Sequence, residues 1–167
     1  STLGNAVITG AGSSWSNAGQ LTIGSYAAGT LRIEDGATVT SNQGYIGAGP
    51  GSDGNVIVTG AGSSWQVSAY NIIVGHNATG SLAIENGALV HAGGGVLLGT
   101  FAGSSGTLTM QGTAADRAVL ETSGIQAGLG TVNLVLDGAL LRATADTGAF
   151  FSGFDGQDIT LGANGLA

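Results

Sequence analysis

The chain contains no cysteine, no lysine and a single proline, and only 8% of its residues are charged. Without cysteine it can form no disulfide, no thiolate metal site and no thiol nucleophile. Its only cationic side chains apart from histidine are Arg32, Arg117 and Arg142, and the net charge is −7. A basic patch for nucleic acid or for an anionic membrane surface is therefore excluded, and we expect neither partner.

No apolar run is long enough to span a bilayer as a helix, so we expect no membrane insertion of this chain. Hydrophobic residues make up 43% of the sequence, which is sufficient to fill a core. The sequence has no signal peptide and does not begin with Met. We expect residues 1–167 to be a single domain that belongs to a longer protein.

An internal repeat sets the organisation of the chain. Asn5–Trp15 reads NAVITGAGSSW and Asn55–Trp65 reads NVIVTGAGSSW. Recurring glycines divide the sequence further into rungs of about 25 residues, and the similar segments lie two rungs apart. The predicted rungs are 5–29, 30–54, 55–80, 81–106, 107–130 and 131–156, with 157–167 beginning a seventh.

Within each rung the apolar residues alternate with other residues, as in Leu31 and Ile33 or Leu82 and Ile84. Period-two alternation is typical of strands with one buried face. Two more short strands follow in each rung, and no segment has helical spacing. The sequence predicts an all-β fold, a parallel β-helix or β-solenoid with three strands per rung and about 6.5 rungs. Residues 131–167 depart from the repeat and are expected to form distinct C-terminal rungs.

Two segments resemble a known family. Val56–Trp65 (VIVTGAGSSW) and Thr30–Val39 (TLRIEDGATV) resemble the passenger repeats of AIDA-type autotransporters, type V secreted surface proteins of Gram-negative bacteria. Residues 138–146 (GALLRATAD), followed by FSGF at Phe151–Phe154 and ITLG at Ile159–Gly162, resemble the stretch after those repeats.

The resemblance implies a right-handed β-helical passenger domain at the bacterial cell surface. Such a passenger is anchored in the outer membrane through a C-terminal β-barrel that this sequence does not contain, or it is released. Passengers of this family are commonly adhesins or self-associating factors, and less often toxins or enzymes. None of the family's catalytic motifs is present, so no catalytic residue and no cofactor are carried over.

The two tryptophans, Trp15 and Trp65, allow two interpretations. An exposed indole can stack on a sugar ring. Both residues, however, fall near the column held by Val39 and Val90 in the alternate rungs. We therefore interpret them as structural residues that fill a wide corner.

Carboxylates and histidines offer weak candidates for chemistry. Glu34 and Glu85 occupy equivalent places two rungs apart, which repetition alone explains, and we expect no enzyme. His76 and His91 lack a consistent third metal ligand, so we expect no metal site. Asp53 falls short of a calcium-binding repeat, although weak calcium binding stays open.

The predicted outward position of the third strand gives the candidate interaction face. The residues at that position are Thr22, Tyr45, Ile73, Leu97, Gln126 and Phe151. Tyr45, Ile73, Leu97 and Phe151 are large and apolar where solvent is expected, and exposed apolar stripes often mark interaction surfaces. Two alternatives compete with this interpretation: the strand phase is off by one residue, or a neighbouring segment covers the stripe.

The sequence favours a non-catalytic extracellular adhesin that associates with itself, as in autoaggregation, or with a host surface or glycan. The alternative is a released passenger that acts as a host-cell ligand or toxin. A polysaccharide-active enzyme on the same scaffold is the least favoured of these. Most features of the sequence recur from rung to rung, and such repetition is typical of a structural and adhesive rod.

Overall fold

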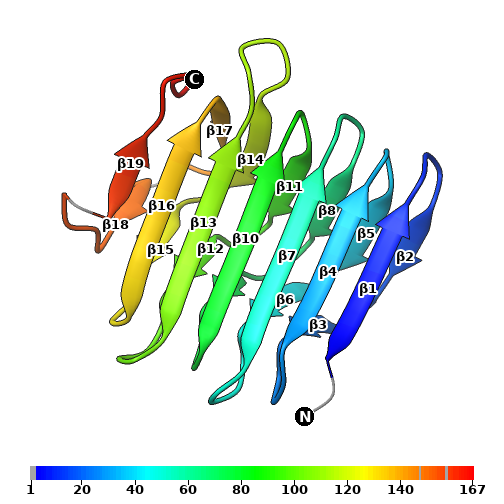
Figure 1. Cartoon of the computed structure of the whole chain (residues 1–167). Coiled ribbons are helices and arrows are strands. Elements are labelled where there is room, and N and C mark those ends of the chain that lie inside the picture. Colours follow the sequence, from blue (N-terminus) through cyan, green and yellow to red (C-terminus); the bar gives the residue numbers. More distant parts are fainter. Residues whose placement is uncertain (1–2, 147, 157) are drawn as a thin grey trace.

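The computed structural model describes residues 3–146, 148–156 and 158–167, and this part of the chain contains strands and no helix. Positions 147 and 157, within the distinct C-terminal rungs expected for 131–167, lie outside the described residues. The strands run along the chain in a repeating order of three, and each set of three makes one turn of a coil (Figure 1).

The strands form three parallel sheets. The first sheet consists of β1 (Gly4–Thr9), β4 (Gly29–Glu34), β7 (Asp53–Thr59), β10 (Thr79–Glu85), β13 (Ser105–Gln111), β16 (Thr131–Asp137) and β19 (Ile159–Leu161). The second consists of β2 (Ser14–Ser16), β5 (Thr38–Ser41), β8 (Ser64–Val67), β11 (Leu89–Ala92), β14 (Ala118–Thr122) and β17 (Ala139–Ala143). The third consists of β3 (Gln20–Ile23), β6 (Gln43–Ile46), β9 (Ile72–Val74), β12 (Val96–Leu98), β15 (Ile125–Ala127) and β18 (Phe151–Ser152).

Each strand pairs with the equivalent strand one turn earlier and one turn later, except the strands at the two ends of each sheet, which pair on one side. Gly80 pairs with Gly54 on one side and with Gly106 on the other, which fixes a turn of about 26 residues. The predicted all-β solenoid with three strands per rung is confirmed, with about six turns.

The predicted start of the sixth rung is wrong. The glycine pattern ends the fifth rung at Gly130 and so aligns Thr107 with Thr131, but the strand register pairs Thr107 with Asn133. The error is two residues, so Leu134 and Leu136 still point inward, as alternation requires. Gly130 belongs to the turn before β16, whereas Gly106 lies within β13.

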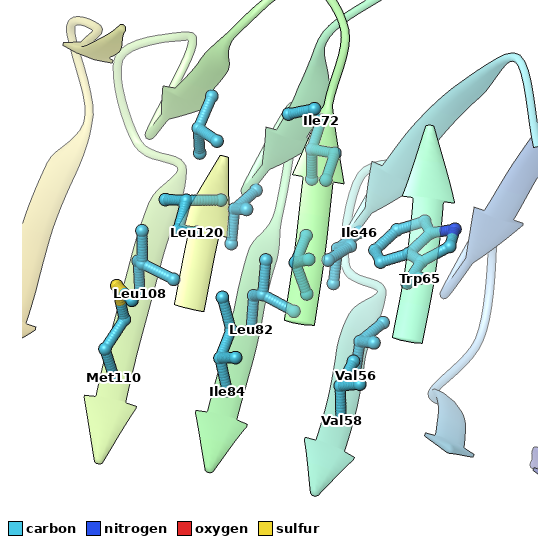
Figure 2. Packing of buried hydrophobic residues seen from close by; sticks show 14 of the residues in the cluster. Ile46, Val56, Val58, Trp65, Ile72, Leu82, Ile84, Leu108, Met110 and Leu120 are labelled. Carbon is cyan, nitrogen blue, oxygen red and sulfur yellow. The ribbon is translucent and has the colours of Figure 1, made fainter. Parts of the chain in front are cut away.

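The core is a set of aliphatic columns enclosed by the three sheets. Val56, Leu82, Leu108 and Leu134 stack in successive turns of the first sheet and are at most 1% exposed. Figure 2 shows Val56, Leu82 and Leu108 pointing toward side chains of the other two sheets, and Trp65 is the largest of the fully buried side chains. Because each rung buries its inner face against its neighbours, stability depends on stacking.

The turns between the first and second sheets come in two alternating kinds. Gly10 and Gly12, like Gly60 and Gly62, adopt positive φ in the GAGS turn of the first and third rungs. In the second and fourth rungs the turn contains a non-glycine residue with positive φ, Asp35 at 56° or Asn86 at 53°. Asp and Asn tolerate this left-handed conformation better than other side chains do. The alternation explains why the similar segments lie two rungs apart.

The turn between β13 and β14 is different from both kinds. It spans residues 112–117, and it projects beyond its neighbours (Figure 1). The charged residues Asp116 and Arg117 lie on it, which keeps them out of the core.

Candidate interaction face

The outer surface of the third sheet carries no charged side chain on strands β3, β6, β9, β12 and β15. The charged residues of the neighbouring strands lie on the other two sheets, for example Arg32 on β4 and Glu121 on β14. The third sheet is thus the face on which a partner displaces the fewest charges.

The strand register places Tyr45, Ile73 and Leu97 in one outward column. Their neighbours in sequence, such as Ile72 and Leu98, point into the core. The column continues through Gln126 to Ser152. Ile73 is only 7% exposed, while Tyr45 and Leu97 are half-buried. The stripe is therefore flatter and less exposed than the sequence indicates.

Phe151 does not belong to this column, which corrects the sequence-based prediction. It pairs with Ile125, an inward residue, because the chain between β17 and β18 is longer than the corresponding segments and shifts the phase by one. Phe151 instead packs edge-to-face on Phe150 and Phe154, with centroid distances of 5.1 and 6.1 Å.

Aromatic side chains on the turns extend the outward column sideways. His76, in the turn after β9, packs edge-to-face on Tyr45 at 5.2 Å between centroids, and Phe101, in the turn after β12, packs on His76 at 4.9 Å. These three rings come from three successive rungs and form a ladder beside the sheet. Aromatic pairs of this geometry stabilise by about 0.5–1.5 kcal/mol beyond the area they bury.

The most exposed aromatic residues also flank the third sheet. Tyr26 follows β3 and is 84% exposed, Tyr70 precedes β9 and is 60% exposed, and Phe101 is 46% exposed. We call Tyr26, Tyr45, Tyr70, His76 and Phe101, together with the outward column of the third sheet, the aromatic face. All three tyrosines of the chain lie on it.

The sequence analysis missed Tyr26, Tyr70, His76 and Phe101 as parts of this face because it followed strands and treated turns as corners. The signal that could have found Tyr26, His76 and Phe101 is their repeated position one or two residues after the glycines that follow the third strand, such as Gly75 before His76. Strands of the third sheet are two to four residues long, about 7–13 Å, so a residue on either flanking turn lies close to the sheet.

A shallow groove of about 240 Å³ adjoins the aromatic face at the turns that precede the strands of the third sheet. Its polar side chains are Asn71, Ser123, Gln126 and Ser152, its apolar wall includes Leu97, and Gly94 and Gly95 form part of its floor. Its lining contains no charged residue. Amides and hydroxyls suit an uncharged ligand that donates and accepts hydrogen bonds.

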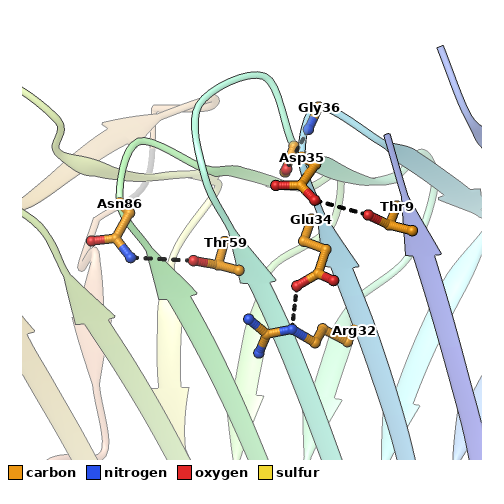
Figure 3. A network of polar contacts seen from close by, with 8 residues as sticks. Thr9, Arg32, Glu34, Asp35, Gly36, Thr59 and Asn86 are labelled. Atoms are coloured by element: carbon orange, nitrogen blue, oxygen red, sulfur yellow. Dashed lines mark hydrogen bonds and ion pairs between the residues drawn. The ribbon is translucent and has the colours of Figure 1, made fainter. Parts of the chain in front are cut away.

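The carboxylate pair considered from sequence lies on the outward face of the first sheet. Thr59 stands between Glu34 and Glu85 in the same column. Glu34 accepts an ion-pair hydrogen bond from Nε of Arg32, and Asp35 accepts a hydrogen bond of 3.0 Å from Thr9 (Figure 3). The Thr9–Asp35 hydrogen bond connects rung 1 to the turn of rung 2, whereas the Arg32–Glu34 pair lies within β4.

His76 and His91 lie on different parts of the solenoid. The Nδ1 atom of His91 is 3.4 Å from Glu121, and Arg142 donates a 3.0 Å hydrogen bond to the same carboxylate. Within the described residues no three His, Asp or Glu side chains gather as a metal site would require, and Asp53 is exposed at the start of β7. No helix in the described part of the chain could cross a membrane.

Trp15 and Trp65 lie in the column of Val39 and Val90 on the second sheet. Trp65 is fully buried, and its Nε1 donates a 3.2 Å hydrogen bond to Ser41. Trp15 occupies the same place in the first rung and is 36% exposed at the N-terminal end of the solenoid.

These features define a parallel β-solenoid protein with one uncharged aromatic face. Comparison of the chain with models of known protein families, with curated proteins and with solved structures found no match.

Proposed function

We propose that this chain is a non-catalytic adhesive module of a bacterial surface protein, and that the aromatic face associates with the same face of a second copy. The observation that carries the proposal is that three exposed aromatic residues, Tyr26, Tyr70 and Phe101, lie in turns that flank a sheet without charged side chains on its outer surface. The resemblance of the repeats to autotransporter passengers supports a cell-surface setting.

The chemistry of the face favours association. Tyrosine and phenylalanine are enriched at interface cores, because their rings cover much area with little loss of side-chain freedom. A face that repeats along a rigid rod also allows weak contacts at successive rungs to add up. The face contains both a pre-formed ring ladder, Tyr45–His76–Phe101, and freely exposed rings on its margins.

Charge sets the expected salt dependence. With a net charge of −7, two copies repel each other at long range, while their aromatic faces carry no like charges to bring together. Added salt screens that repulsion, since the Debye length falls from about 10 Å at 0.1 M to about 3 Å at 1 M. Association through this face should therefore strengthen with salt, whereas association through ion pairs would weaken.

A second candidate function is binding to an uncharged glycan on a host surface, which agrees with the alternative of a host-cell ligand. The polar groove lined by Asn71, Gln126 and Ser152 favours it, since amides and hydroxyls can match sugar hydroxyls. The exposed ring of Tyr70 adjoins Asn71 in sequence and offers a stacking surface. A polysaccharide-active enzyme is less supported, because this groove has no carboxylate in its lining.

Sedimentation velocity over a wide concentration range tests the proposal. The test variant is Tyr70→Asp/Phe101→Asp, which places charges at two exposed positions of the aromatic face. The matched control is Val7→Asp, an exposed apolar position, 49% accessible, on the first sheet. Ile73 is unsuitable for such a test, because a charge at a 7% exposed position would damage folding.

We expect reversible dimers or larger species for the wild type and for Val7→Asp, increasing with salt, and a monomer for the double variant. A wild type that stays monomeric at every concentration and salt would contradict self-association. In that case a glycan array with the wild type and Asn71→Ala would test the second candidate.

A further inference from the structure

The N-terminal end of the solenoid exposes residues whose counterparts are buried in the interior, and the internal repeat identifies those counterparts. Rung 1 (residues 5–29) and rung 3 (residues 55–80) share the sequence TGAGSSW at equivalent positions. Rung 3 is covered on its N-terminal side by rung 2 (residues 30–54), whereas none of the described strands pairs with the same side of rung 1. The contacts of rung 3 therefore show what the exposed side of rung 1 is shaped to meet.

Rung 3 uses three kinds of contact with rung 2. Ser63 is buried, and its Oγ accepts a 3.0 Å hydrogen bond from the backbone N–H of Gly36. The Nε1 of Trp65 donates to Ser41. The far edge of the indole lies against Gly44, where a Cβ would come within 2.7 Å of the ring.

The equivalent groups of rung 1 lie exposed. Ser13 corresponds to Ser63 and is exposed, and Trp15 corresponds to Trp65 and is 36% exposed instead of 0%. An apolar hollow of about 620 Å³ opens at this end, lined by residues that include Ala6, Trp15 and Leu21. Ala6 and Ile8 are half-buried here, although their counterparts in rung 3, Val56 and Val58, are fully buried.

We propose that this end face is a docking surface for one further parallel β-rung built like rung 2 and joined to the chain ahead of Asn5. The docked rung carries a glycine at the place of Gly44 to admit the indole of Trp15. It also carries a serine at the place of Ser41 to accept the indole N–H, and a backbone N–H at the place of Gly36 for Ser13. Tyr26 of the aromatic face also lines this hollow, but the contacts proposed here are made by Ser13 and Trp15 and do not require that face to bind a second copy.

A second copy of this chain does not meet these requirements with its C-terminal end. The residues of its last turn that correspond in register to Ser41 and Gly44 are Ala143 and Phe151. Alanine cannot accept the indole hydrogen bond, and a phenylalanine fills the space that the indole needs. Head-to-tail stacking of two copies is therefore not complementary.

The experiment extends the full chain by a copy of residues 30–54 placed directly before Asn5 in place of residues 1–4. This reproduces the natural junction between Gly54 and Asn55. The matched control is the same extension with Gly44→Val in the copy, which puts a β-branched side chain where the ring must lie. A second control carries Ser41→Ala in the copy and removes only the acceptor.

Acrylamide quenching of tryptophan fluorescence is the readout, combined with thermal unfolding. Because Trp65 is fully buried, the quenchable emission of the parent chain comes from Trp15. We expect the extension to abolish this quenching and to raise the unfolding midpoint. The Gly44→Val extension should leave quenching at the parent level, and the Ser41→Ala extension should give a smaller rise in midpoint.

Three results would overturn the inference. The first is an extension that leaves Trp15 as accessible as in the parent. The second is equal protection by the Gly44→Val extension, because the face would then lack the specificity proposed. The third is quenching of Trp15 in the parent chain that falls as the protein concentration rises, with the same fall in the Tyr70→Asp/Phe101→Asp variant. A second copy of the chain would then cover the end face, without using the aromatic face.

Discussion

The indole of Trp65 occupies the space that a side chain on Gly44 would need, one rung away on the third sheet. A Cβ built on Gly44 would lie 2.7 Å from both Cη2 and Cζ2 of the ring. Gly44 is the glycine of a column that otherwise holds Leu21, Ile72, Val96, Ile125 and Phe151. The pair shows that the large side chain of Trp65 in rung 3 is accommodated by the missing side chain of Gly44 in rung 2.

Gly44→Ala should therefore destabilise the protein, because the ring is rigid and fully buried and has no room to move. Overpacking of this kind costs about 1–3 kcal/mol. Chemical denaturation measures the loss. Gly4→Ala is the control, because a Cβ at Gly4 would meet nothing within 4 Å. Equal stabilities of the two variants would show that the core around Trp65 rearranges to accept the added methyl group.

Ser41→Ala should destabilise the protein by leaving the Nε1–H of Trp65 without its acceptor. A buried unsatisfied donor costs about 1–3 kcal/mol. In a Trp65→Phe background the same substitution should cost less, since the donor is then gone. Thr40→Ala, on the outward side of the same strand, is the control. A cost of Ser41→Ala that is unchanged by Trp65→Phe would refute the assigned hydrogen bond.

Asn86→Ala should be more destabilising than Asn86→Gly. The residue has a φ of 53°, a conformation that costs an alanine about 1–2 kcal/mol and a glycine almost nothing. Both substitutions remove the 3.2 Å hydrogen bond from Asn86 to Thr59, so their difference isolates the backbone effect. Urea unfolding of the two variants gives that difference. A more stable alanine variant would contradict the assigned turn conformation.

Leu120→Ala should destabilise by about 2–5 kcal/mol, because the side chain is fully buried in the column between Val90 and Leu141. Val119→Ala, one residue away and pointing outward, is the control. Because each rung contacts only its neighbours, amide hydrogen exchange should accelerate most in β11, β14 and β17. Acceleration spread evenly to β2 would show that the solenoid unfolds as one unit.

The sequence predicted inward and outward sides better than it predicted register. Strand alternation assigned Ile72 and Val74 to the core and Ile73 to the outer face, as the structure has them. The predicted fifth-rung boundary was wrong by two residues, which an alternating pattern cannot detect, because a shift of two leaves every side chain on its own face.

For Phe151, in contrast, the sequence predicted the wrong side of the sheet. The segment between β17 and β18 is longer than its counterparts, so counting from neighbouring rungs moved this residue from the inward to the outward column. The backbone pairing with Ile125 decides its place, and that pairing is invisible to local patterns. Local patterns also could not predict contacts between turns. Phe101 packs on His76 only because the stacking of rungs brings their two turns side by side.

The sequence by itself determined the solenoid, its three strands per rung and the two-rung spacing of its similar segments. These features are local: alternation of apolar residues and recurring glycines specify each rung, and repetition specifies the stacking. The tertiary structure alone decided which side chains share a column and which of them reach solvent. Contacts such as Trp65 with Gly44 or His76 with Tyr45 join different rungs, and only the hydrogen-bonded register between rungs brings them together.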